Sequence, residues 1–204
     1  LDLNFRHQAL GLATQGLPPK RIAILGNAAG TMARAATRFF PDATVDGVDI
    51  DAELPRLGRR YFGLSHERFT AITADARPFL RATDNRYDVI VVDAYRQPYI
   101  PCYLTTREFF ALARTRLTPG GVLIINVGHP ENNTDLERVL AATLRTAFPH
   151  VARDPTVRLN TMLVASDTPI VAQRMRDAAA RLAPELQTLA DREARLLEPA
   201  LTGG

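Results

Sequence analysis

The segment from Ile22 to Asp51 contains, in order, a short apolar run, a turn of small residues, a helical stretch and a second apolar run. The turn, GNAAG (26–30), would let another molecule approach the backbone closely, and Asp49 follows it by about 20 residues. An acid in that place can accept hydrogen bonds from both hydroxyls of a ribose. The segment therefore predicts a βαβ unit that binds a nucleoside, with an ordinary βαβ unit whose turn is small only for packing as the alternative.

The rest of the chain continues this alternation. We expect strands at 22–25, 44–48, 69–73, 89–92, 122–127 and 159–165. We expect helices near 32–40, 52–62, 77–82, 106–117 and 135–148, another over 3–15, and one or two surface helices within 170–197. The motif TPGG (118–121) predicts a turn that ends one helix and starts the next strand. Alternation of this kind predicts an α/β fold of the doubly wound, Rossmann-like type, with a mostly parallel sheet covered on both faces and with C-terminal helices.

Length and composition predict one globular domain over residues 1–204, with a core at about 21–166 and a C-terminal helical segment at about 168–200. Hydrophobic residues make up 46% of the chain and charged residues 23%, and no apolar run is long enough to span a bilayer. The single cysteine, Cys102, excludes an internal disulfide and fits a reducing compartment, so we expect a cytoplasmic protein in which Cys102 is partly buried.

Charges and histidines exclude two classes of site. The 25 basic and 22 acidic residues are scattered, which predicts no nucleic-acid partner, and arginines such as Arg34 and Arg38 are expected on solvated outer faces of helices. His7, His66 and His150 share no spacing typical of a metal site, so no metal is predicted.

Three acids stand where predicted strands end: Asp49, Asp75 and Asp93. Ligands of open parallel sheets bind beyond the carboxyl ends of the strands. Asp49 suits a ribose, Asp75 could accept from an adenine amino group, and Asp93 would face the reacting end of the ligand. The alternative for Asp75 is that it caps the helix expected to start near Arg77.

Six segments, ILGNAAG, VDGVDID, ITADARPFL, YDVIVVDAY, LTTREFF and LTPGGVLIINV, resemble in order and spacing the spermidine synthase family and its bacterial spermidine-synthase-like relatives. The resemblance implies the class I methyltransferase fold and decarboxylated S-adenosylmethionine as the donor, with methylthioadenosine as co-product. It also implies that Asp93 opens a catalytic loop and that residues 95–101 form a gate over the substrate. The cofactor-binding residues then expected are Gly26, Asn27, Ala28, Gly30, Asp49, Ile50, Asp75, Ala76 and Asp93.

The sequence also departs from that family. Its enzymes carry a second acid, held to deprotonate the attacking amine, where this chain has Arg96. An arginine cannot act as that base at neutral pH and would repel a polyamine cation. Ala28 and Ala29 stand where the family usually has glycine, and the chain shows no counterpart of the family's β-rich N-terminal domain or of the acidic segment common in its membrane-fused members.

Three functions remain open. The first is aminopropyl transfer to a polyamine, with Asp93 holding the cation. Glu131 or Asp135 could add to that site, with capping of the following helix as the alternative for both. The second is methyl transfer from intact S-adenosylmethionine to a small amine or hydroxyl compound. In it, Arg96 would bind a carboxylate, and Tyr95, Tyr99 or His129 would position or deprotonate the acceptor. The third is nucleoside or partner binding without catalysis. A homodimer and a membrane domain in a longer parent chain also stay open. The candidate catalytic residues are Asp93, Tyr95, Arg96, Tyr99 and His129.

Overall fold

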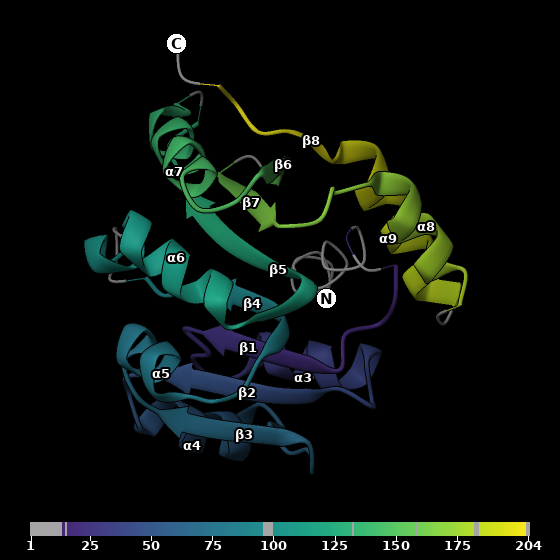
Figure 1. The fold of residues 1–204 in the computed structure, drawn as a ribbon. Coiled ribbons are helices and arrows are strands. Elements are labelled where there is room, and N and C mark those ends of the chain that lie inside the picture. Colours follow the sequence, from purple (N-terminus) through teal and green to yellow (C-terminus); the bar gives the residue numbers. More distant parts are fainter. Residues whose placement is uncertain are drawn as a thin grey trace.

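Strands and helices alternate along most of the chain, as predicted (Figure 1). The computed structural model describes residue 14 and residues 16–95, 100–131, 133–157, 159–181 and 184–202. The strands are β1 (Arg21–Leu25), β2 (Thr44–Asp49), β3 (Phe69–Thr73), β4 (Tyr87–Val92), β5 (Leu117–Gly128), β6 (His150–Val157), β7 (Asn160–Ser166) and β8 (Glu198–Pro199). The helices are α3 (Thr31–Phe39), α4 (Glu53–Tyr61), α5 (Ala76–Ala82), α6 (Arg107–Thr115), α7 (Asp135–Arg145), α8 (Ala172–Ala179), α9 (Pro184–Leu196) and the 3-10 turn η1 (Cys102–Leu104). The helix expected over 3–15 lies almost wholly outside the described residues.

The eight strands form one sheet in the order β3-β2-β1-β4-β5-β7-β6-β8. The first five strands in this order are parallel to one another, and β7, β6 and β8 each pair antiparallel with their neighbours. The strand order reverses between β1 and β4, so the carboxyl ends of β1, β2 and β4 flank the point where ligands of such sheets bind. The predicted doubly wound α/β fold with a mostly parallel sheet is confirmed.

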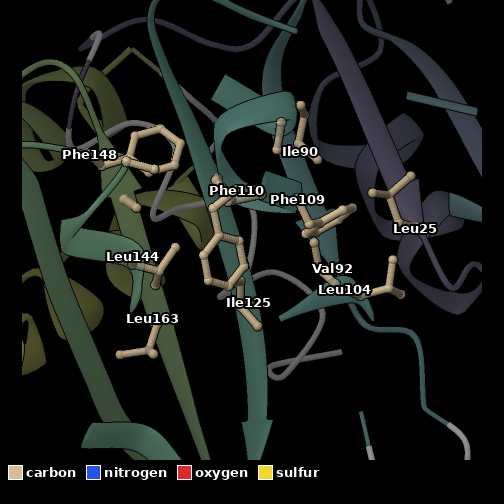
Figure 2. Packing of buried hydrophobic residues seen from close by; sticks show 14 of the residues in the cluster. Leu25, Ile90, Val92, Leu104, Phe109, Phe110, Ile125, Leu144, Phe148 and Leu163 are labelled. Carbon is tan, nitrogen blue, oxygen red and sulfur yellow. The ribbon is translucent and has the colours of Figure 1, made fainter. Parts of the chain in front are cut away.

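Both faces of the sheet are buried, because the central strands are largely apolar and successive side chains point to opposite faces. Ile22 and Ile24 of β1 join the core beneath α3, α8 and α9, whereas Ala23 and Leu25 join the core beneath α5, α6 and α7. Figure 2 shows the second core, in which the rings of Phe109 and Phe110 have centroids 5.9 Å apart. Continuous apolar strands such as β1 are typical of parallel sheets covered on both sides.

Strand β6 was not predicted from the sequence. Its run HVARDPTV contains Pro155, and proline inside a run argues against a central strand. The structure accommodates the proline in an irregularity of the β6–β7 pairing between Asp154 and Val157. A buried ion pair also holds β6: the Nε of Arg153 lies 2.6 Å from Oε1 of the fully buried Glu137 on α7. That contact lacks hydrogen-bond geometry, but Arg153 Nη2 donates to Glu137 Oε2 at 3.0 Å.

The turn predicted at 118–121 is corrected, because these residues lie within β5. The pairing of β4 with β5 shifts between Tyr87 and Val89, and Gly120 takes a φ of +78°. A Cβ on Gly121 would stand 2.9 Å from the carbonyl oxygen of Tyr87. The glycines therefore let β5 bulge against β4 rather than forming a separate turn before the strand.

Candidate functional site

The GNAAG turn joins the ends of three strands. The backbone N–H groups of Gly26 and Asn27 both donate to the carbonyl of Val48, at 2.9 and 3.1 Å. Gly26 has a φ of +95°, and a Cβ there would lie 2.5 Å from the backbone oxygen of Asp93. Only glycine fits this place, so the end of β1 sits directly against the ends of β2 and β4.

Asp49 is fixed against the turn by two backbone donors. Its Oδ2 accepts from the N–H of Ala28 at 2.7 Å, and its Oδ1 accepts from the N–H of Asp51 at 3.0 Å. Ala28 has a φ of +46°, a conformation that costs a non-glycine residue roughly 1 kcal/mol and that the charged hydrogen bond helps to offset. Each carboxylate oxygen keeps a second lone pair, which is the capacity that two ribose hydroxyls require.

Ile50, which follows Asp49, and Asn27, which follows Gly26, differ in how far their side chains are exposed. The side chain of Ile50 is 69% exposed and forms an apolar surface directly after Asp49. The side chain of Asn27 is only 3% exposed, and its Oδ1 is buried without a hydrogen-bond partner. It packs against Gly47, where a Cβ would stand 2.8 Å from that Oδ1. The backbone of Asn27 is also used within the turn, since its N–H donates to Val48 and its carbonyl accepts from the N–H of Gly30 at 2.9 Å, so Asn27 shapes the turn rather than reaching toward a ligand.

Asp75 is the N-cap of α5, so the capping alternative is correct, although a ligand contact is compatible with it. Its Oδ1 accepts from the N–H of Arg77 at 2.9 Å, and its Oδ2 accepts from the hydroxyl of Tyr103 at 2.7 Å. Ala76 is the first residue of α5, where backbone N–H groups have no partner within the helix. Tyr103 was missed because nothing local links η1 to α5. The carboxylate of Asp75 and the backbone N–H of Ala76 therefore place an acceptor and a donor side by side, as the edge of an adenine requires.

A chain of side-chain amides holds Asp93. The Nδ2 of Asn126, on β5, donates to Asp93 Oδ1 at 2.8 Å, and the Nδ2 of Asn160, on β7, donates to Asn126 Oδ1 at 2.8 Å. Because the oxygen of Asn126 is already taken, its amide group must point toward Asp93. Both asparagines were missed, and the usable signal was an amide inside the otherwise apolar run 122–127.

Tyr95 and His129 are held by hydrogen bonds to β5, β7 and the loop that follows β5. The Tyr95 hydroxyl donates to the carbonyl of Asn126 at 2.8 Å and accepts from the N–H of Gly128 at 2.5 Å. Burial raises the pKa of this phenol, the Asp93 carboxylate raises it further, and the Gly128 hydrogen bond opposes both. Tyr95 is therefore neutral at physiological pH and suits positioning better than proton removal.

Both ring nitrogens of His129 are engaged. Its Nδ1 lies 3.0 Å from the carbonyl oxygen of Pro130, an atom that can only accept, so Nδ1 carries the proton. Its Nε2 then accepts from the hydroxyl of Thr161 at 3.1 Å. This arrangement ties the start of the loop after β5 to β7 and leaves no ring nitrogen aimed at a substrate.

Some of the expected residues fall outside the described part of the chain, whereas the strand-end acids lie together. Arg96 and Tyr99, with most of the expected gate over 95–101, lie outside the described residues. Cys102 directly follows the gate and is exposed, so the expectation of partial burial is wrong. The structure places Gly26, Asp49 and Asp93 together at the switch in strand order, with Asp75 beside them at the end of β3.

The described part of the chain shows neither a group of metal-binding side chains nor a helix that could span a membrane. No three histidine, cysteine, aspartate or glutamate side chains there are grouped as metal ligands would be. Within the same residues, no helix combines the length and the apolar character needed to cross a bilayer.

Comparison with known proteins identifies the family of this chain. The family model described as "Spermine/spermidine synthase domain" matches residues 7–177. A "Probable polyamine aminopropyl transferase" of Bifidobacterium longum is 34% identical over 126 residues, which are 61% of this chain and 28% of that protein. A "Polyamine aminopropyltransferase" of Vibrio vulnificus is 33% identical over 134 residues, which are 64% of this chain and 44% of that protein. The chain thus spans less than half the length of either relative.

A solved structure shares the whole fold. The crystal structure of a probable spermidine synthase from Corynebacterium glutamicum matches with a TM-score of 0.73 and 26% identity, covering 100% of this chain and 81% of that one. The family match covers most of the chain and includes every strand-end acid of the site. The chain therefore belongs to the spermine/spermidine synthase domain family.

Proposed function

We propose that this chain is an aminopropyltransferase domain that takes the aminopropyl group of decarboxylated S-adenosylmethionine and transfers it to a polyamine or a related small amine. The observation that carries the proposal is the placement of Asp49 and Asp93 on either side of the glycine turn, at the switch in strand order. The names of the relatives, which are polyamine aminopropyltransferases, support the same reaction.

The donor would lie across the ends of β1, β2 and β3. Asp49 would accept from the two ribose hydroxyls, and the exposed side chain of Ile50 would lie against the adenine ring. Asp75 would accept from the adenine amino group while the N–H of Ala76 donates to a ring nitrogen. The turn at Gly26 has no side chain, so the sulfur end of the donor could pass close to Asp93.

The reaction needs a carboxylate at the far end of this pocket. The lone pair of an uncharged amine attacks the methylene carbon bound to the sulfonium, a new C–N bond forms, and the C–S bond breaks. Its electron pair returns to sulfur, which leaves as the neutral thioether of methylthioadenosine, and the new ammonium loses one proton. Asp93 would hold the amine in line for attack and accept that proton, with Asn126 fixing the direction of its carboxylate.

Arg96 makes this chain differ from the family, and we propose that it narrows the choice of acceptor. A guanidinium three residues after Asp93 would repel long polycations and favour an acceptor with fewer positive charges. Methyl transfer gains no support from the described residues, because Tyr95 and His129, two of its candidate acceptor-positioning groups, are held by hydrogen bonds within the fold.

The experiment that tests the proposal separates the donors. The protein is incubated with decarboxylated or intact S-adenosylmethionine and a mixed pool of small amines, and the nucleoside products are identified by mass spectrometry. Methylthioadenosine that depends on the protein and disappears in Asp93→Asn is the expected result. S-adenosylhomocysteine from the intact donor would overturn the proposal in favour of methyl transfer, and tight binding of methylthioadenosine with no turnover in any arm would overturn it in favour of a binding role.

A further inference from the structure

A crevice of about 410 Å³ opens between helix α3 and the segment that joins α4 to β3. It shares no lining residue with the nucleoside site described above. Its charged and hydroxyl-bearing lining side chains include Thr31, Arg34 and Arg38 on α3, and Ser65 and His66 on the opposite wall. Among the described residues that line it there is no carboxylate, so each of their strongly polar side chains can donate a hydrogen bond.

The two arginines point to the same side of α3 because they are four residues apart. Both are exposed, and within the described residues neither forms an ion pair or a side-chain hydrogen bond. The guanidinium of Arg38 lies 6.0 Å from the ring centroid of Phe39. By contrast, Arg56 on the next helix is paired with Glu53, and Arg114 on α6 is paired with Asp167. Two guanidinium groups on one wall of the crevice therefore have no anionic partner in the part of the chain that the structure describes.

The opposite wall adds neutral donors. The Nδ1 of His66 accepts from the backbone N–H of Arg68 at 3.1 Å, so in the uncharged ring the proton sits on Nε2, which can donate. Glu67 is the acid next to this wall, but its side chain is 84% exposed and lies 4.0 Å from Arg68 rather than in the crevice. Ser65 and Thr31 contribute hydroxyls at the two sides.

We propose that this crevice binds a phosphate group, either as free phosphate or as part of a small phosphorylated molecule. Two guanidinium groups with an imidazole N–H and hydroxyls match an anion that carries more than one charge and several outward oxygens. Arg34 and Arg38 are exposed, as expected for outer faces of helices, and the proposal gives them a ligand in addition. The inference goes beyond the proposed function, because neither the donor nor a polyamine carries a phosphate.

The segment that forms one wall of the crevice also packs against the glycine turn. Leu64 lies between two lining residues in sequence, and a Cβ on Gly30 would stand 2.5 Å from its Cδ1. Phosphate that bridges α3 and residues 63–66 would hold this segment against the glycine turn. A ligand that binds only the folded chain raises its stability, so phosphate should raise the melting temperature.

The test measures binding of inorganic phosphate, diphosphate and glycerol phosphate by isothermal titration calorimetry, at constant ionic strength with chloride as the reference anion. We expect dissociation constants of about a millimolar, because the site is partly open to solvent. Arg34→Ala and Arg38→Ala should each weaken binding about threefold to tenfold, and the double variant should abolish it. Stronger binding of glycerol phosphate than of phosphate would identify a phosphorylated metabolite as the ligand, and the reverse would identify free phosphate.

Two controls make the outcome decisive. The double variant Arg59→Ala/Arg60→Ala removes the same charge from α4 outside the crevice and should leave phosphate binding unchanged. An equal loss of binding in this variant would show that phosphate responds only to the net charge of the protein, and it would refute the site. Asp49→Ala should also keep phosphate binding, and a loss would place the phosphate in the nucleoside site instead. Alanine at exposed helix positions preserves the helix, so circular dichroism should show folded variants. Absence of binding by all three probes to the unaltered protein would refute the proposal whatever the fate of the proposed function.

Discussion

Replacement of Asn160 by leucine tests whether the amide chain orients Asp93. Asn160 donates to Asn126 Oδ1, and Asn126 donates to Asp93 Oδ1, each at 2.8 Å. The first bond joins neutral groups and is worth about 1 kcal/mol, whereas the second involves a charge and is worth about 1.5–3 kcal/mol. Asn160→Leu should therefore lower kcat/KM for the amine about fivefold, and Asn126→Leu about tenfold to a hundredfold.

The double variant gives the sharper result. If Asn160 acts only by orienting Asn126, then the double variant should be no slower than Asn126→Leu alone. Binding of methylthioadenosine, measured by calorimetry, should remain unchanged in all three variants because none contacts the ribose or adenine positions. Additive effects on kcat/KM, or equal losses in nucleoside binding, would refute the orienting role and would make Asn160 a general structural residue.

Three further predictions concern the turn, a buried phenol and the gate. Gly58→Ala places a Cβ 2.4 Å from the carbonyl oxygen of Ala29, so it should cost about 1–2 kcal/mol in urea unfolding and weaken methylthioadenosine binding. Gly63→Ala meets no atom within 4 Å but strains a backbone with a φ of +62°, so it should cost about 1 kcal/mol of stability and leave that binding unchanged. Burial raises the pKa of Tyr87 to about 12 in the folded chain, against 10.0 for the ordinary phenol, so the unfolded chain releases this proton first. Stability from Tyr87 is thus complete below pH 10 and falls by about 2 kcal/mol as the pH rises to 12, and Tyr87→Phe should remove that fall in denaturant melts at the two pH values. Arg96→Asp restores the family's acid and should raise kcat/KM for polyamines about tenfold; an unchanged value would exclude a role for Arg96 in acceptor choice.

The parts of the fold that follow from local pattern were predictable. The apolar runs of β1 and β4 and the order of strands and helices indicated a mostly parallel sheet, and the spacing from Gly26 to Asp49 predicted that the turn and the acid belong to one nucleoside site. In the structure the two are adjacent, because the N–H of Ala28 donates to Asp49. These features depend on residues close in sequence or on a pattern that every parallel strand shares.

The features that were missed depend on pairings between distant residues. Strand β6 was missed because it contains Pro155. A proline fits there only because the pairing with β7 is irregular between Asp154 and Val157, and no local sequence pattern indicates that irregularity. The contact between Asn126 and Asn160 and the hydrogen bond from Tyr103 to Asp75 likewise join elements that only the folded chain brings together. The bulge of β5 resembles a turn in sequence, since both require a glycine at positive φ.

The central claim is that this chain moves an aminopropyl group onto an amine. The most direct test supplies decarboxylated S-adenosylmethionine labelled with carbon-13 in its aminopropyl chain, together with unlabelled small amines, and follows the label by mass spectrometry. We expect the label to appear in the amine product in equal amount to the methylthioadenosine released, and to disappear in Asp93→Asn. Release of methylthioadenosine with the label left in hydrolysed donor fragments, or labelled amine formed equally without the protein, would contradict the proposal.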